Sequence, residues 1–329
     1  MVKKPISIVF FTAAGALLSL LIALCLGSYP LHLSQIWHSL VYASNDTPMQ
    51  IILQLRLPRI LTAACCGGLL AVAGALLQVM LRNPLADPYV LGISGGAVFF
   101  NLLACVLGLG VLGNALGALL GAGLAMLTLY GLLAWQRSWS AEVILLMGIV
   151  LASGWGALTS LVLSLASSDQ LPGMVFWLMG DLSQARWPWV GAACLLVSAV
   201  GIWRLCPELD LLRLGRLQAA SLGVDTGKLY RQLLCLSAIL TTGSVISAGN
   251  IGFIGLIVPH FMRRWVGSTH RVLLPAAFFA GSALLVVADT VARTVIAPLQ
   301  LPVGVVTALI GVPCFLSILV RAHYRGVTG

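Results

Sequence analysis

The sequence predicts an all-α polytopic membrane protein with ten transmembrane helices in two inverted five-helix repeats. Of the 329 residues, 60% are apolar and only 8% are charged, whereas about 25% of residues are charged in an ordinary soluble domain. Apolar runs near the ~20 residues that a membrane-spanning helix needs recur along the chain. Lysine and arginine are unevenly shared between successive connections. This composition excludes a soluble enzyme, a disordered chain and a nucleic-acid-binding protein.

Polar stretches and Pro/Gly breaks separate the apolar runs. The first run follows Lys3 and Lys4 and is about 22 residues long, longer than the roughly 7–15 of a cleaved signal segment, so we expect a retained first helix. The longest polar connection extends from Cys206 to Lys228. The ten expected spans are 6–27, 60–81, 91–111, 115–134, 143–166, 188–205, 230–249, 252–267, 273–295 and 303–321.

The basic residues set the orientation of these spans. With the amino terminus in the cytoplasm, 14 of the 18 lysines and arginines fall in cytoplasmic segments, and four, Arg56, Arg59, Arg186 and Arg293, fall outside. This asymmetry follows the positive-inside rule and places both chain termini in the cytoplasm. It also accounts for the net charge of +9 without a nucleic-acid partner.

Weak internal similarity indicates a repeat. At an offset of 175 residues (259 − 84), Pro84 matches Pro259 and Gly92 matches Gly267; chance matches are the alternative. Five spans per repeat is an odd number, so the halves would be inverted in the membrane, as in many transporters. We expect one transmembrane domain over 1–329, with repeat one at about 6–168, repeat two at about 188–321 and a cytoplasmic segment at about 207–227.

The sequence predicts no catalytic, cofactor or metal site on this chain. The Gly227-Lys228 pair has leucine at 222 and 229, where a phosphate-binding loop needs glycine and Ser/Thr. The eight cysteines contain no C-x-x-C pair, and the five histidines show no metal-binding spacing. Any ATP must therefore be hydrolysed by another chain.

Two groups of charges on the expected outer side suggest a partner. Arg56-Leu57-Pro58-Arg59 places two arginines where the positive-inside rule disfavours them. They either reach lipid headgroups or dock an acidic surface of a soluble protein. Asp289 and Arg293 are spaced i,i+4, which fits either an intrahelical ion pair or a partner contact.

Two further segments lie on the cytoplasmic side. The connection from Leu81 to Pro88 holds two prolines and is stiff, which suits either a simple turn or a gate. The segment from Pro207 to Gly227 mixes leucines with Arg213, Arg216 and Gln218. Such an amphipathic segment either lies on the membrane surface or docks in a groove of a cytosolic subunit.

Taken together, these motifs resemble one family, the permease subunits of ABC importers for vitamin B12, ferric siderophores and haem (type II importers). The resemblance runs from residue 56 to 313 in family order. The matching motifs are Arg56-Leu-Pro-Arg59, Ala73-Gly-Ala-Leu-Leu-Gln78, Asn83-Pro-Leu-Ala-Asp-Pro88, Leu91-Gly92, Trp177-Leu-Met-Gly180, Ile251-Gly-Phe-Ile-Gly-Leu-Ile-Val-Pro-His260, His270-Arg-Val-Leu-Leu-Pro275, Ala288-Asp-Thr-Val-Ala-Arg293 and Leu301-Pro-Val-Gly304.

The resemblance implies an assembly and a set of site residues. It implies a homodimer in the bacterial inner membrane, surrounded by lipid, with two cytosolic ATPase subunits that use ATP and magnesium and one periplasmic binding protein. The implied binding-protein contacts are Arg56, Arg59 and Arg293. The implied cytoplasmic gate is Asn83 and Leu85, with a second part at Ala141 and Glu142, where the B12 member has small hydroxyl residues. The implied ATPase coupling residues are Leu211, Leu212, Arg213, Leu214, Arg216, Leu217, Gln218, Ser221, Leu222 and Gly223.

Two alternatives remain open at this point. An ion-coupled secondary transporter would need carboxylates or histidines at the membrane midplane, and Asp289 is the one candidate. An ABC permease for zinc or manganese ions should show clusters of histidine or acidic residues, which the sequence lacks. Within the family, ferric siderophore, haem and cobalamin are all compatible cargoes, because the binding protein is expected to set specificity.

Overall fold

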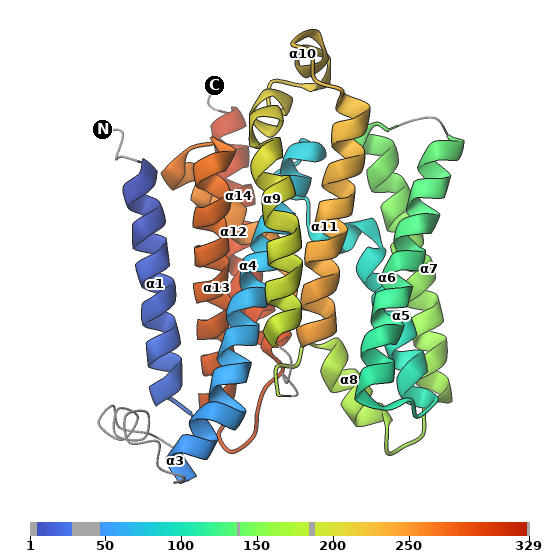
Figure 1. Cartoon of the computed structure of the whole chain (residues 1–329), viewed down its shortest axis with the longest axis vertical. Helices are drawn as coiled ribbons and strands as arrows, with labels where there is room; N and C mark the ends of the chain where they lie inside the picture. Colours follow the sequence, from blue (N-terminus) through green and yellow to red (C-terminus); the bar gives the residue numbers. More distant parts are fainter. Residues whose placement is uncertain (1–4, 28–46, 137–138, 184–187, 328–329) are drawn as a thin grey trace.

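The computed structural model describes residues 5–27, 47–136, 139–183 and 188–327. In these residues every regular element is a helix, and the long helices form a bundle aligned along one direction (Figure 1). Seven helices within the described ranges are long and apolar enough to cross a bilayer. These observations confirm the all-helical membrane-protein class. Every expected span contains one helix of at least 13 residues, but the count of ten crossings stays a prediction.

The first half of the chain begins with an unbroken helical run. The short α3 (Thr47–Gln50) and the π-helical η1 (Ile51–Arg56) continue into α4 (Leu57–Met80), so Arg56 and Arg59 lie within a helix and not in a connection before it. Pro58 is tolerated because its missing N–H falls where the π-helical turn becomes α-helical. The other helices of this half are α1 (Pro5–Cys25), η2 (Pro88–Leu91), α5 (Ile93–Val106), α6 (Gly110–Trp135) and α7 (Ala141–Leu165).

The second half adds two short helices between the long ones. The connection between the fifth and sixth expected spans contains α8 (Leu171–Leu178). The sixth expected span is longer than predicted, since α9 continues to Leu212 because Leu209 and Leu212 are fully buried. The elements of this half are α9 (Pro188–Leu212), α10 (Arg216–Ser221), α11 (Thr226–Ala248), α12 (Ile254–Val266), α13 (His270–Thr294) and α14 (Val303–Val327).

Helix lengths recur in the same order in the two halves. The helices α4, α5, α6 and α7 have 24, 14, 26 and 25 residues, and α11, α12, α13 and α14 have 23, 13, 25 and 25. Each short helix follows a non-helical connection. Residues 81–87 precede η2 and α5, and residues 249–253 precede α12. This order is compatible with the expected repeat, which stays a prediction. However, α12 starts at 254, so an offset of 175 would align its beginning with the end of α4 and not with α5.

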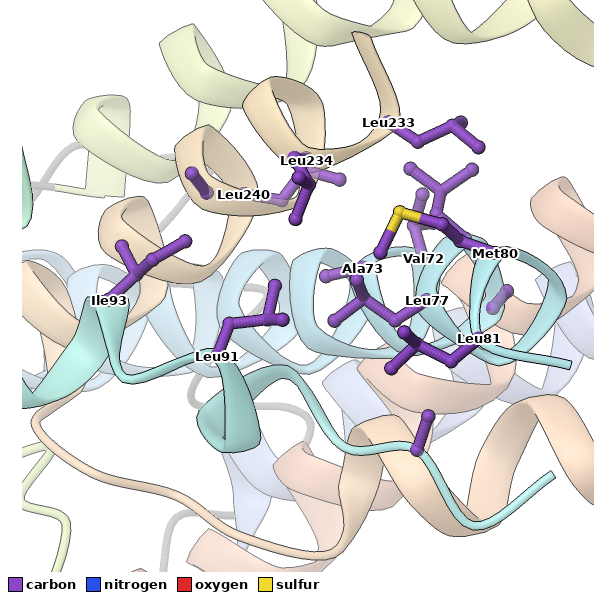
Figure 2. Close-up of a cluster of buried hydrophobic side chains, with 14 of the residues drawn as sticks. Val72, Ala73, Leu77, Met80, Leu81, Leu91, Ile93, Leu233, Leu234 and Leu240 are labelled. Atoms are coloured by element: carbon purple, nitrogen blue, oxygen red, sulfur yellow. The ribbon is translucent and has the colours of Figure 1, made fainter. Parts of the chain in front are cut away.

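The helix α4 forms the centre of the bundle. Within the most apolar 18-residue stretch of the helical run Ile51–Met80, 83% of the residues are buried, against 11% in the corresponding stretch of α7. The helix α4 packs against α9, α11, α12 and α13. Figure 2 shows one side of this core, where Leu77 and Met80 of α4 lie near Leu233 and Leu234 of α11. Small residues allow the close approach elsewhere, because a Cβ on Gly74 would overlap the carbonyl of Gly255.

A polar link crosses the core where α4 meets α12. Pro259 lacks an N–H, so the carbonyl of Gly255 has no partner within its own helix. The side-chain amide of Gln78 donates to this carbonyl at 3.3 Å and to that of Leu256 at 3.0 Å. Arg263 completes the link by donating to Oε1 of Gln78 at 2.8 Å. The amide thus replaces a helix hydrogen bond that the proline removes.

Candidate functional site

A cluster of three arginines, two of them paired with one carboxylate, lies at the end of the bundle opposite α10, near α3 (Figure 1). Asp289 on α13 is only 1% exposed and forms ion pairs with Arg59 at 2.8 Å and with Arg293 at 3.0 Å. Arg59 approaches with both Nε and Nη2, so the contact is bidentate. The intrahelical i,i+4 ion pair, one of the two alternatives that the sequence left open, is present, and its carboxylate is shared with an arginine 230 residues away.

The third arginine of the cluster, Arg56, is directed at the end of α1. Its Nη1 donates to the carbonyls of Leu24 and Cys25. Arg56 is 5% exposed and Arg293 is 6% exposed, while Arg59 also reaches Gln300 at 2.7 Å. Three guanidinium groups against one carboxylate give the cluster a formal charge of +2 (3 − 1). The sequence led us to expect arginines projecting outward, but they are largely packed inward. Arg186 lies outside the described residues.

The first gate segment follows α4 at the same end of the bundle as α10. Asn83 closes a tight turn, because its Oδ1 accepts the N–H of Leu85 at 2.9 Å. The N–H of Asn83 in turn donates to the carbonyl of Gln78 at 3.2 Å. Leu85 is 36% exposed. The turn therefore fixes the backbone and leaves the leucine side chain available.

The chain then returns into the protein interior through η2. Asp87 accepts the N–H of Tyr89 at 2.9 Å, and the hydroxyl of Tyr89 accepts the N–H of Ile251 at 3.0 Å. These bonds fix 87–91 to the connection before α12. On its other side η2 packs on α7 at Gly148, where a Cβ would lie 2.6 Å from the carbonyl oxygen of Val90.

The second gate segment begins α7. The Ser140 hydroxyl caps the helix by accepting the N–H of Val143 at 3.3 Å. Ala141 is half-buried and Glu142 is exposed in the first turn, where its negative charge is favourable to the helix dipole. The element that follows the first gate segment, η2, thus packs on the helix that begins with the second gate segment.

The predicted coupling residues form the last turn of α9, a turn and the six-residue α10, which stands apart at one end of the bundle (Figure 1). Leu212 and Ala219 are fully buried and attach this segment to the bundle. By contrast, Leu217 is 87% exposed, and Leu214 and Leu222 are more than half exposed. Such a group of leucines beside Arg213, Gln218 and Ser221 has the composition of a protein contact.

A pocket of about 570 Å³ lies between η2, the 249–253 connection and α14. Its lining is mostly apolar, with Phe253, Leu256 and Val305 among the residues and Asn250 as one of few polar groups. Phe253 occupies the left-handed region at φ 71°, which is rare for a bulky residue. No group of three or more metal-ligating side chains occurs in the described part of the chain.

The comparisons with known proteins agree with this arrangement. The model of the FecCD transport family matches residues 15–321. The chain belongs to the FecCD transport family. It is 39% identical to the hemin transport system permease protein HmuU of Yersinia pestis, over 93% of this chain and 95% of that protein. It is 38% identical to the vitamin B12 import system permease protein BtuC of Vibrio vulnificus, over 94% and 95%.

A solved structure extends the agreement to three dimensions. An inward-facing metal-chelate type ABC transporter matches with a TM-score of 0.85 and 31% identity, covering 97% of this chain and 99% of that one. The FecCD chain described here is therefore a multi-pass membrane permease of the ABC-importer type. Permeases of this family act with ATPase and substrate-binding partners, and the ATP is used by the ATPase.

Sequence reasoning missed the polar contacts between helices. It named Gln78 only as part of a motif, and it did not connect Asp210 with His270, whose Nδ1 lies 2.6 Å from the carboxylate. A lone amide in an apolar run and a proline inside another run were visible signals of the Gln78 link. No sequence signal identified their pairing, because the partners are 177 residues apart.

Proposed function

We propose that this FecCD permease moves an iron chelate, a ferric siderophore or haem, or cobalamin from a periplasmic binding protein to the cytoplasm. It would do so as a homodimer in a bacterial inner membrane, with two separate cytosolic ATPase subunits and both chain termini in the cytoplasm. The observation that carries the proposal is the exposed α10 at the end of the bundle opposite the arginine cluster, where Leu217 and the flanking Leu214 and Leu222 are more than half exposed. One permease thus offers two contact surfaces at opposite ends.

The outer surface would use the arginine cluster for binding-protein docking. The net charge of the cluster attracts carboxylates, and Arg59, with 11% of its side chain exposed, is the member nearest to solvent. Arg56 and Arg293 would act mainly by holding the cluster together and contributing positive potential. This division of roles follows from their burial and replaces the simpler idea of three projecting side chains.

The inner gate would be formed by Asn83, Leu85, Ala141 and Glu142. The turn at Asn83 and the cap at Ser140 hold short backbone segments rigidly, which suits elements that swing as units. A large cargo must leave as readily as it enters, so a pathway of weak contacts is appropriate. The apolar pocket beside Phe253 fits such a pathway.

Reconstituted uptake tests the proposal. The permease, its ATPase and its binding protein are placed in proteoliposomes, and uptake of haem, a ferric siderophore and cobalamin is measured with ATP present or depleted and with or without an uncoupler. We expect uptake of one chelate class that requires ATP and survives the uncoupler. Uptake abolished by the uncoupler would indicate a secondary transporter, and uptake of zinc or manganese alone would also refute the proposal.

A further inference from the structure

Arg216, the first residue of α10, is directed into the protein while its neighbour Leu217 is directed outward. Its Nη1 donates to the backbone carbonyl of Trp139 at 3.1 Å, and its Nε donates to the hydroxyl of Thr226 at 3.4 Å. Its guanidinium also lies 5.6 Å from the ring centre of Tyr230. A planar guanidinium with three such contacts has little freedom to move independently. Arg216 therefore forms a fixed connection from α10 to Trp139.

Contacts with its indole ring also hold Trp139 in place. The guanidinium of Arg231 lies 5.7 Å from the centre of its ring, and the ring of Tyr130 meets it edge-on at 5.2 Å. The Tyr130 hydroxyl donates to the carbonyl of Arg231 at 2.8 Å, which closes this set of contacts. Trp139 comes two residues before Ala141, so a force applied to its carbonyl acts on the start of α7.

The backbone of α10 is built for this direction of Arg216. Gly215, the N-cap, has φ 119°, a conformation that L side chains rarely adopt. A Cβ at Gly215 would lie 3.6 Å from Nη1 of Arg82, the residue before Asn83 of the first gate segment. Arg213 differs from Arg216, because it is exposed and donates to the carbonyl of Ser268, away from both gate segments.

From these contacts we infer that Arg216 is a positioning residue that transmits displacement of α10 to the gate at the start of α7. Leu217 takes up the movement of the ATPase, and the adjacent Arg216, about 100° around the helix, passes it to the carbonyl of Trp139. The inference rests on the proposed function, since it takes α10 as the ATPase contact and Ala141–Glu142 as part of the gate.

Transport efficiency tests this role. The reconstituted complex is assayed for chelate delivered per ATP hydrolysed. Arg216→Ala removes a hydrogen bond from a charged donor and should lower this ratio at least about tenfold while ATP hydrolysis continues. Arg216→Lys, which can still donate to the carbonyl, should restore part of the ratio. Lys228→Ala removes an exposed positive charge at the same end of the bundle and should leave the ratio unchanged.

Hydrogen–deuterium exchange supplies a readout that a purely structural role would not change. In the wild-type complex, ATP binding should alter protection of both the peptide covering 216–222 and the peptide covering 139–146. In Arg216→Ala the first response should remain and the second should be lost. If Arg216→Ala does not assemble, Thr226→Val, which removes the acceptor that orients Nε, should show the same loss in weaker form.

The possible outcomes distinguish failure of the inference from failure of the proposed function. An Arg216→Ala complex with wild-type transport per ATP and an unchanged response at 139–146 overturns the inference and leaves the proposed function intact. An equal loss in Lys228→Ala also overturns it, because general charge would then be the cause. Absence of ATP-driven uptake by the wild-type complex overturns the proposed function and this inference together.

Discussion

Replacement of Asp289 by alanine should strongly destabilise the outer end of the permease. The carboxylate is 1% exposed and forms ion pairs with both Arg59 and Arg293. Its loss leaves two largely buried guanidinium groups without their counter-ion, and breaking a buried pair in this way costs about 3–5 kcal/mol. The unfolding entropy of globular proteins, about 2.1 cal/mol/K per residue, is an upper limit for a permease whose helices remain in lipid, so the melting temperature should fall by at least roughly 4 °C.

The assay is thermal unfolding of the purified permease in lipid nanodiscs, followed by fluorescence-detected size exclusion. Asp289→Asn is the matched control, because it retains the shape and two acceptor sites on Oδ1 but removes the charge, and it should give an intermediate loss. The double variant Asp289→Ala with Arg293→Met should be less destabilised than the sum of the two single variants, since it removes one unpaired charge. A fall below 2 °C for Asp289→Ala, or simple additivity, would refute the reasoning.

Three further predictions concern other parts of the molecule. Gly74→Val should prevent the close crossing of α4 and α12, because a Cβ at this position overlaps the carbonyl of Gly255. The yield of folded protein on size exclusion should fall severely. The control Gly123→Val, at a position with open space around it, should not change the yield. Leu217→Asp should weaken ATPase binding about tenfold or more in a co-purification titration, because burying a leucine side chain contributes about 1.5–3 kcal/mol. The melting temperature of the isolated permease should not change. Normal ATPase affinity would contradict the assignment of α10. Arg59→Gln should lower binding-protein affinity at low ionic strength and much less at high ionic strength, because exposed charges are screened; equal affinities of wild type and variant at low salt would exclude a docking role for Arg59.

Hydropathy and charge distribution made the helical membrane fold predictable. The apolar runs are long, and each contains a helix, because a backbone in lipid must satisfy its own hydrogen bonds. The end of α9 was less predictable, since the polar composition after Cys206 suggested a connection, while the buried Leu209 and Leu212 keep the segment helical.

The candidate site was predictable in identity and less so in geometry. Arg56, Arg59 and Arg293 were recognised as unusual because they contradict the charge rule, and this signal needs no structure. Their inward direction depends on Asp289 and on the carbonyls at the end of α1, which are distant in the chain. The role of Arg216 was similarly hidden, because its acceptor is a backbone carbonyl and a backbone atom leaves no mark on sequence composition.

The link between Gln78 and α12 has a consequence for biosynthesis. With 13 residues and two arginines in its last turn, α12 is too short and too charged to be retained in a bilayer by itself. Its unpaired Gly255 carbonyl and the Arg263 side chain find their partners on α4, which is synthesised much earlier. Insertion of α12 therefore depends on an α4 that is already in the membrane, and expressing the second half of the chain alone should leave α12 outside the lipid.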